Sequence, residues 1–152
     1  RSETDVGDLI ADMLDSYFSR DAERITVSLP DEPVVASVDP ARIMLLLKNL
    51  ISNALRYSKP EDGPVELVLS TEGDDLVITI TDHGPGLSKN QAEHIGEPFY
   101  RSDQSRARQS GGTGLGLYLA SLAAEAHCGS LTLLDTGGHG ASFKVRIPSL
   151  NP

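Results

Sequence analysis

The chain has 152 residues, of which 39% are hydrophobic and 23% are charged, a composition typical of one globular domain with a buried core. Its 22 acidic and 13 basic residues give a net charge of −9, which argues against nucleic acid as the main partner. The single cysteine, Cys128, excludes an internal disulfide, and its place at the end of an apolar helical pattern favours a small buried residue over a reactive thiol. No apolar run reaches the roughly 20 residues that cross a bilayer. Because the first residue is Arg1 and not Met, we expect residues 1–152 to be a single domain excised from a longer chain.

Hydrophobic periodicity divides the chain into helices and strands. We predict, in chain order, a helix over 6–17 after Ser2 and Thr4, strands over 24–29 and 34–38, a helix over 39–58, a hairpin of 65–69 and 76–80, a short helix over 88–93, a helix over 115–126, and paired strands over 131–134 and 142–147. Asp39-Pro40 begins the longest helix well, because Asp caps free amides and Pro is tolerated at the first helical position. Residues 97–113 show no periodicity, which is typical of a functional or disordered loop. This mixture predicts a two-layer α/β sandwich with no second domain.

The predicted helix over 39–58 carries two amides on one face. Asn49 and Asn53 are four residues apart, and Arg56 and Tyr57 follow within a turn. Solvated polar positions are one explanation. The other is a ligand site, in which Asn53 offers a carbonyl oxygen to Mg²⁺ while the ion also binds phosphate oxygens. Arg56 would then neutralise phosphate, and Tyr57 would pack against a base.

A second polar motif, Asp82-His83-Gly84-Pro85-Gly86, follows the predicted hairpin. Asp-x-Gly-x-Gly is compatible with a simple turn. It also suits adenine, because a carboxylate only accepts hydrogen bonds and adenine presents an exocyclic amine. Gly84 and Gly86 would let the backbone approach the purine closely.

A third motif, Gly112-Thr113-Gly114-Leu115-Gly116, immediately precedes a predicted helix. Free amides and the positive end of the helix dipole favour phosphate at such a junction. Three arginines lie just upstream and would give an acidic protein a locally positive lining: Arg101, Arg106 and Arg108. No Gly-Lys-Ser/Thr follows, and no strand precedes the glycines, so neither a Walker A loop nor a dinucleotide fingerprint is predicted.

Together these motifs resemble those of the ATP-binding, catalytic domain of bacterial sensor histidine kinases, on the Bergerat fold shared with DNA gyrase and MutL-type ATPases. Residues 49–58 resemble the N box, 82–86 the G1 box, 97–101 the F box, 112–116 the G2 box and 138–143 the last glycine box. The resemblance covers essentially the whole chain. It implies a mixed, mainly antiparallel sheet of about five strands, about three covering helices and a flexible ATP lid.

The resemblance also implies roles for individual residues. Asn53 would be the Mg²⁺ ligand, and Asn49, Asn53 and Arg56 would be the catalytic set. Phe99 to Ser110 would form the lid, and the glycines of the G2 box its hinge. The implied nucleotide-binding residues are Asn53, Arg56, Tyr57, Asp82, Gly84, Gly86, Phe99, Arg101, Gly112, Thr113, Gly114, Leu115 and Gly116. In the last box, Ala141-Ser142 stands where the family more often has Gly-Thr.

One position indicates the branch of this superfamily. Hydrolysing relatives resemble this chain but carry a glutamate one turn before the metal-binding Asn. Asn49 stands there and cannot act as a general base, which favours a histidine acceptor because neutral histidine is already a competent nucleophile. None of His83, His94, His127 or His139 lies in a phosphoacceptor context, and we interpret each as a surface or turn histidine.

We therefore predict a cytoplasmic domain of an inner-membrane-anchored sensor kinase. It would bind Mg·ATP and phosphorylate a histidine on a separate dimerisation hairpin, with a response regulator as an indirect partner and no membrane contact of its own. The alternatives are an ATPase or molecular clamp on the same fold, or a module that binds nucleotide without chemistry.

Overall fold

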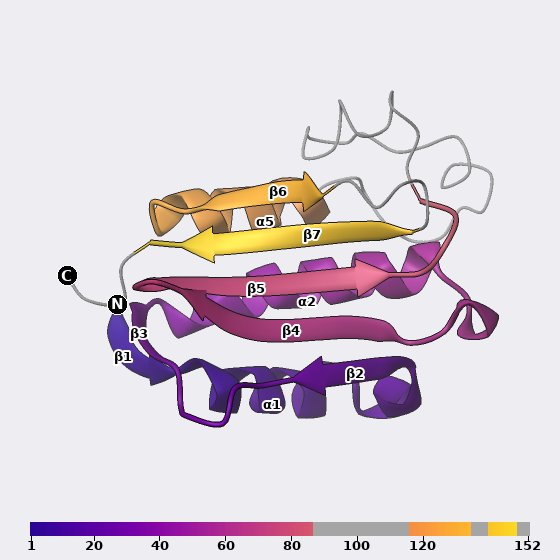
Figure 1. The fold of residues 1–152 in the computed structure, drawn as a ribbon, viewed down its shortest axis with the longest axis horizontal. Coiled ribbons are helices and arrows are strands. Elements are labelled where there is room, and N and C mark those ends of the chain that lie inside the picture. Colours follow the sequence, from indigo (N-terminus) through magenta and orange to yellow (C-terminus); the bar gives the residue numbers. More distant parts are fainter. Residues whose placement is uncertain (87–115, 135–139, 149–152) are drawn as a thin grey trace.

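A five-stranded sheet lies in front of three helices in Figure 1, forming the two layers of a sandwich. The structure is a computed structural model, and it describes residues 1–86, 116–134 and 140–148. The sheet order is β2-β4-β5-β7-β6; β2 runs parallel to β4 and the other neighbours are antiparallel. The sheet strands are β2 (Ile25–Ser28), β4 (Val65–Glu72), β5 (Asp75–Asp82), β6 (Ser130–Leu134) and β7 (Ala141–Ile147). The covering helices are α1 (Val6–Tyr17), α2 (Pro40–Tyr57) and α5 (Gly116–Ala126).

A second, two-stranded sheet closes the lower left of the molecule in Figure 1. It pairs β1 (Ser2–Asp5) with β3 (Val35–Val38) in antiparallel register. Strand β1 is not predictable from its sequence, because its four residues, Ser-Glu-Thr-Asp, lack the alternating apolar pattern of a strand. Two short 3₁₀ helices, η1 (Ser19–Arg24) and η2 (Pro60–Asp62), were also not predicted.

The two long N-terminal helices begin at aspartates. Asp39 caps α2 by accepting from the amides of Ala41 and Arg42 at 3.1 and 3.3 Å, as the Asp-Pro pair predicts. The cap of α1 is Asp5, which accepts from Asp8 N, so the prediction of a start after Ser2 and Thr4 missed the capping residue.

The core lies between the sheet and the helices. The alternate residues of β4 and β5 that face the helices are buried, and α2 buries one side of its length; its buried residues are Ile43, Leu46, Leu47, Leu50, Ile51 and Ala54. Helix α5 packs against α2 through small side chains, Ala120, Ala123 and Ala124. Helix α2 therefore packs both on the sheet and on α5, which lies beside it in the same layer (Figure 1), and the predicted sandwich with its mixed sheet is confirmed.

Candidate functional site

The buried carboxylate of Asp82 lies at the C-terminal end of β5, on the central strand of the sheet. Its side chain is only 2% exposed, and its Oδ1 accepts a hydrogen bond from Gly84 N at 3.0 Å. Burial raises the pKa of Asp82, while the backbone amides of Gly84 and Ala141 act in the opposite direction by donating to the carboxylate. Buried carboxylates cost stability, so one fixed at a strand end points to a ligand site.

The turn after Asp82 packs directly on the last turn of α2. A Cβ on Gly84 would lie 2.1 Å from the carbonyl oxygen of Tyr57, so only glycine fits at this position. Gly86 has a φ of +82°, in the region that favours glycine. Both glycines of the motif are therefore needed by the backbone. The structure thereby brings together Tyr57 and Asp82, which the sequence places 25 positions apart.

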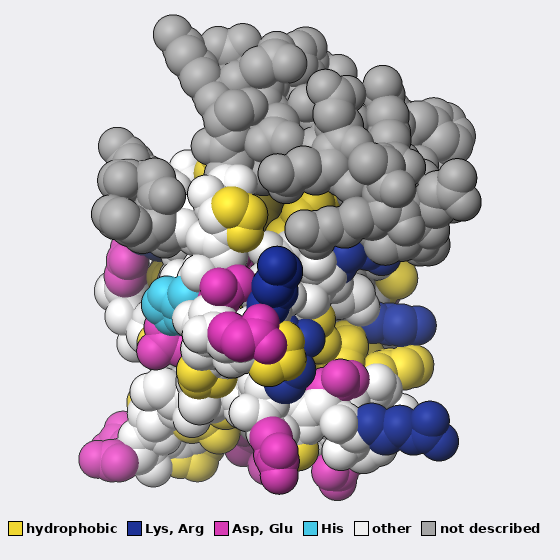
Figure 2. Space-filling view, turned by 90° about the vertical axis from the view of Figure 1, so that its right-hand side faces the viewer, with side chains coloured by type: hydrophobic (Ala, Val, Ile, Leu, Met, Phe, Trp, Pro, Cys, Tyr) yellow, Lys and Arg dark blue, Asp and Glu magenta, His cyan; other side chains and the backbone are white. Residues whose placement is uncertain are grey.

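A cleft of about 310 Å³ opens where these segments meet, lined by Tyr57, Lys59, Asp62, His83, Gly84 and Pro85. His83 lies at its margin with Nε2 2.9 Å from Oε2 of Glu66. Figure 2 looks onto this end of the molecule and shows acidic, basic and histidine side chains close together on the described surface. The cleft thus has a mixed polar rim beside the buried carboxylate.

The amide of Asn49 lies between α2 and the start of α5. Its Nδ2 is buried and has no hydrogen-bond partner among the residues that the structure describes. Gly116, the last glycine of the third motif, begins α5 beside it: a Cβ there would be 3.5 Å from Oδ1 of Asn49. A buried donor without a partner costs stability, and here it lies next to a helix N-terminus, which favours anions. The pair fits a site that a phosphate-bearing ligand completes.

The other predicted residues of α2 lie nearer its C-terminal end. Asn53 lies one turn beyond Asn49 on the same face, and it is half-buried, as are Arg56 and Tyr57. The helix therefore presents amides, then a cation, then an aromatic ring, ending at the Gly84 turn. The remaining predicted site residues lie outside the described residues: Phe99, Arg101, Gly112, Thr113, Gly114 and Leu115. The predicted helix over 88–93 lies outside them too.

Several residues that position this site were not predicted. Arg24 donates to the carbonyl oxygen of Ser58 at 3.1 Å, and the Ser58 hydroxyl donates to Ala54 O at 2.7 Å, so this pair ties down the C-terminal end of α2. Gly140, with a φ of +81°, has no room for a side chain, because a Cβ would lie 2.0 Å from Asp82 O. These contacts join distant segments, and no local pattern in the sequence signals them.

The Ser142 hydroxyl lies 2.8 Å from that of Thr81 across β5 and β7. Ser142, which stands where the family more often has Thr, is thus engaged with the sheet beside Asp82.

Residues 38–151 match the family model described as histidine kinase-, DNA gyrase B- and HSP90-like ATPase. The chain belongs to this family. Among curated relatives of this ATPase domain, it is 39% identical over 124 residues to sensor histidine kinase MtrB of Mycobacterium tuberculosis, which covers 82% of this chain and 22% of MtrB. It is 35% identical over 146 residues to RppB of Synechocystis, covering 94% of this chain and 32% of RppB. The chain spans a third or less of these relatives.

Solved structures agree with the fold of this ATPase domain. The mycobacterial sensor histidine kinase MprB matches with a TM-score of 0.80 at 23% identity, covering 97% of each chain. The histidine kinase domain of the E. coli osmosensor EnvZ matches with a TM-score of 0.73 at 26% identity, covering 97% of this chain and 88% of that one. Full-length ShkA in complex with AMPPNP matches with a TM-score of 0.76 at 25% identity, covering 97% and 31%. The predicted resemblance to sensor histidine kinase ATP-binding domains is confirmed.

Within the described ranges, no three His, Cys, Asp or Glu side chains gather into a group that could hold a metal ion. None of the helices that the structure describes combines the length and apolar character needed to cross a bilayer.

Proposed function

We propose that this domain binds Mg·ATP where α2 meets the Asp82–Gly86 turn. In the complete protein, it would donate the γ-phosphoryl group to a histidine on a separate dimerisation domain of a two-component sensor kinase. The observation that carries this proposal is the buried carboxylate of Asp82, held by Gly84 N at 3.0 Å beside the close approach of Gly84 to Tyr57. Membership of the ATPase family and the AMPPNP complex of ShkA support nucleotide as the ligand.

Adenine would bind at the end of the site where the Asp82–Gly86 turn packs against α2. The ionised Asp82 carboxylate accepts a hydrogen bond from the exocyclic amine of adenine and rejects guanine, which has a carbonyl there. Gly84 brings the backbone against the purine, and Tyr57 packs beside it. The cleft next to Tyr57 and Gly84 is open enough to admit the base.

The phosphates lie toward Asn49, Asn53 and Arg56. The oxygen of Asn53 would hold Mg²⁺, which shields the phosphate oxygens when bound. Because no acidic or histidine cluster is available among the described residues, the ion would depend on Asn53, on water and on the nucleotide itself. Asn49 offers its Nδ2, which no described residue pairs with, and Gly112, Thr113, Gly114, Leu115 and Gly116 are proposed to contribute amides at the start of α5. Phe99 and Arg101 are proposed to belong to the lid.

The acceptor histidine comes from another domain. His127 is 2% exposed, with both ring nitrogens in hydrogen bonds. His83 lies in the adenine turn, at the opposite end of the nucleotide from the transferred group. Transfer forms an N–P bond on the incoming imidazole and breaks the bond from the γ-phosphorus to the bridging oxygen, so ADP leaves. Asn49 is an amide and activates no water, which favours transfer to histidine over hydrolysis.

The complete kinase would be anchored in the inner membrane with residues 1–152 forming a single cytoplasmic domain. Its phosphohistidine would pass the phosphoryl group on to a response regulator, which makes that protein an indirect partner. The support for this proposal is the similarity of the chain to proteins named as sensor histidine kinases.

Substitution of Asn53 tests the metal role. We expect Asn53→Ala to abolish Mg·ATP-dependent phosphorylation of the supplied dimerisation hairpin, measured by transfer of γ-³²P. Asn53→Asp, which keeps an oxygen ligand, should retain part of the activity. Arg42→Ala, exposed at the far end of α2, is the control and should be fully active. Full activity of Asn53→Ala would overturn the metal assignment, and rapid ATP hydrolysis without any hairpin would instead favour an ATPase or clamp.

A further inference from the structure

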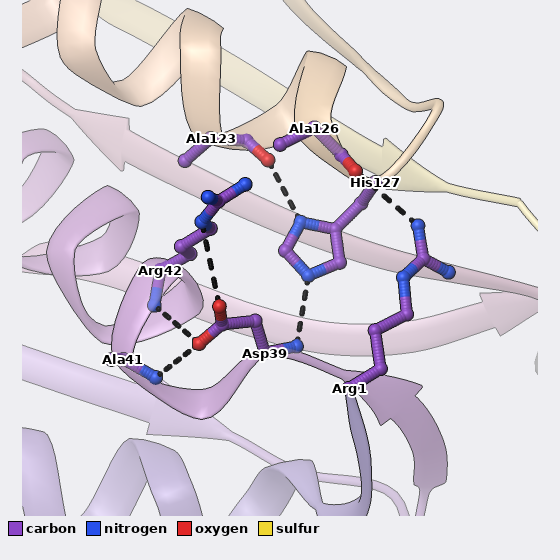
Figure 3. Close-up of polar contacts among 7 residues, drawn as sticks. All are labelled: Arg1, Asp39, Ala41, Arg42, Ala123, Ala126 and His127. Atoms are coloured by element: carbon purple, nitrogen blue, oxygen red, sulfur yellow. Dashed lines mark hydrogen bonds and ion pairs between the residues drawn. The ribbon is translucent and has the colours of Figure 1, made fainter.

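His127 connects the two helices of the site at the end away from the nucleotide. Its ring follows the C-terminus of α5 and is buried. Figure 3 shows the ring between the two helix ends, with Asp39 N donating to Nε2 at 3.0 Å and Nδ1 2.8 Å from the carbonyl oxygen of Ala123. An amide N–H only donates, so Nε2 accepts, and the ring hydrogen lies on Nδ1 and is donated to Ala123. The interpretation of His127 as a surface histidine is therefore wrong, although the residue does lie in a turn.

The groups around the ring belong to three elements. Asp39 is the cap of α2, and its carboxylate also lies 3.4 Å from Nε of Arg42. Arg1, immediately before β1, donates to the carbonyl oxygen of Ala126 at 3.3 Å. The ring therefore lies where the start of α2, the end of α5 and the N-terminal strand meet.

The apolar contact between α2 and α5 does not by itself fix the position of α5 along the axis of α2. The buried residues of α5 are alanines, Ala120, Ala123 and Ala124, and the larger Leu117 is only partly buried against the core. Short methyl groups interlock weakly, so such an interface permits close approach but resists sliding along the helix axis poorly. A directional hydrogen bond between the helices is well suited to set their axial register.

The two ends of this helix pair are in register. His127 meets Asp39 at one end, and Gly116 lies beside Asn49 at the other. His127 is eleven positions after Gly116, and Asn49 is ten positions after Asp39. At 1.5 Å per residue, these separations are about 16 and 15 Å. Because α2 and α5 are antiparallel and these two spacings match, a contact held between His127 and Asp39 keeps Gly116 level with Asn49.

We propose that His127 is a positioning residue for ATP: its bond to Asp39 N fixes α5 on α2 and thereby holds Gly116 against Asn49. The inference rests on the proposed function, since it assigns the phosphate side of the site to these two residues. His127 acts about 16 Å from the phosphates and touches no substrate.

Two substitutions separate this role from a general contribution to folding. In His127→Asn, the side-chain amide nitrogen is attached at Cγ, as Nδ1 of the histidine is, so this variant keeps the bond to Ala123 and loses the bond to Asp39. The longer side chain of His127→Gln reaches the place of Nε2, keeps the acceptor for Asp39 N and loses the bond within α5. Each variant loses one hydrogen bond, so comparable losses of stability are expected.

Their affinities for Mg·ATP should differ. Calorimetric titration well below the unfolding midpoint should show a loss of about fivefold or more for His127→Asn, since it leaves the Asp39 amide unpaired. His127→Gln should stay within about twofold of the wild-type chain. Equal affinities in the two variants, or losses that track stability alone, would overturn the positioning role. If the wild-type chain itself bound no Mg·ATP, the proposed function would fail instead.

A second pair keeps the test decisive if His127→Asn does not fold. Asp39→Ala removes the capping carboxylate and retains the N–H, whereas Asp39→Pro removes both; the φ of −91° at this position is near that of proline. We expect Asp39→Pro to bind Mg·ATP more weakly than Asp39→Ala, because only Asp39→Pro lacks the N–H that donates to His127. Equal affinities would again contradict the proposal.

Discussion

Gly84→Ala is the smallest change that tests how the adenine end of the site is built. The added methyl would lie 2.1 Å from Tyr57 O, 3.1 Å from Tyr57 C and 3.2 Å from Oδ1 of Asp82. Cβ atoms essentially never approach another heavy atom closer than 3.0 Å, so turn and helix must separate by about 0.9 Å. The nearest atoms belong to the backbone, so no side-chain rotation relieves the contact. Overpacking of this kind costs about 1–3 kcal/mol.

The same shift moves the amide that holds Asp82. Gly84 N donates to Oδ1 at 3.0 Å, so displacing the turn reorients the carboxylate that would accept from adenine. Losing one hydrogen bond to a charged group costs about 1.5–3 kcal/mol, or roughly 10- to 150-fold in affinity. We therefore expect Gly84→Ala to unfold at lower urea concentration and to bind Mg·ATP at least about tenfold more weakly by calorimetry.

Gly7→Ala is the matched control for this experiment. It adds the same methyl group within α1, where the nearest atoms would be Oδ1 of Asp5 at 3.4 Å and Cδ1 of Leu29 at 3.7 Å, both ordinary contacts. Alanine is the better helix former, so this variant should be unchanged or more stable by up to about 1 kcal/mol, with wild-type affinity. Wild-type stability and affinity in Gly84→Ala would refute the assignment of this turn.

Two further predictions concern the same strand end. Burial raises the pKa of Asp82, so its contribution to stability is present below its ordinary pKa and is lost as pH rises through the raised value. As pH is lowered from neutrality, the free energy of unfolding of wild type should rise relative to that of Asp82→Asn. Over the same range, the ATP affinity of wild type should fall relative to that of the variant. If stability and affinity changed in the same direction, this prediction would be contradicted. The Thr81 and Ser142 hydroxyls, 2.8 Å apart, should show a coupling of about 1 kcal/mol in a double-mutant cycle of Thr81→Val and Ser142→Ala, measured by urea unfolding. No coupling would mean that the two hydroxyls contribute independently.

Local patterns predicted the main elements of the fold well. The first helix, the Asp39-Pro40 start of α2 and the hairpin of β4 and β5 all follow from periodicity and turn residues. What they did not predict were features that depend on a distant partner. Strand β1 forms only by pairing with β3. Strand β2 pairs in parallel with β4, although the whole of α2 separates the two strands in the sequence. The parallel pairing makes the sheet mixed, which only the family resemblance implied.

Single residues at chain reversals were the least predictable. Cys128, which a helical pattern places among small buried residues, is exposed and has a φ of +58° in the turn between α5 and β6. The adjacent His127 is buried, so the two neighbours exchange the environments expected of them. A turn that reverses the chain points consecutive side chains to opposite sides, and composition does not say which of the two faces inward.

Some residues of the site could be predicted from their chemical type, and others are recognisable only from their packing. Asp82, Asn49 and Asn53 stood out because such groups are costly or unnecessary beside an apolar core. Ser58, which anchors the end of α2, and Gly140, which leaves room for Asp82 O, carry no chemical signature of their own. Their roles follow only from the contacts made in three dimensions.

The buried polar groups of α2 and its neighbours show which end of the sandwich awaits a ligand. At the far end, His127 is buried and both ring nitrogens are satisfied within the protein. At the near end, Asn49 Nδ2 is buried with no partner in the described part of the chain, and the buried Asp82 carboxylate has a raised pKa. A fold selected for stability alone would have satisfied or removed such groups, as it has at His127. Asn49 and Asp82 both lie where we propose that ATP binds, so bound nucleotide should stabilise this end of the domain more than the other.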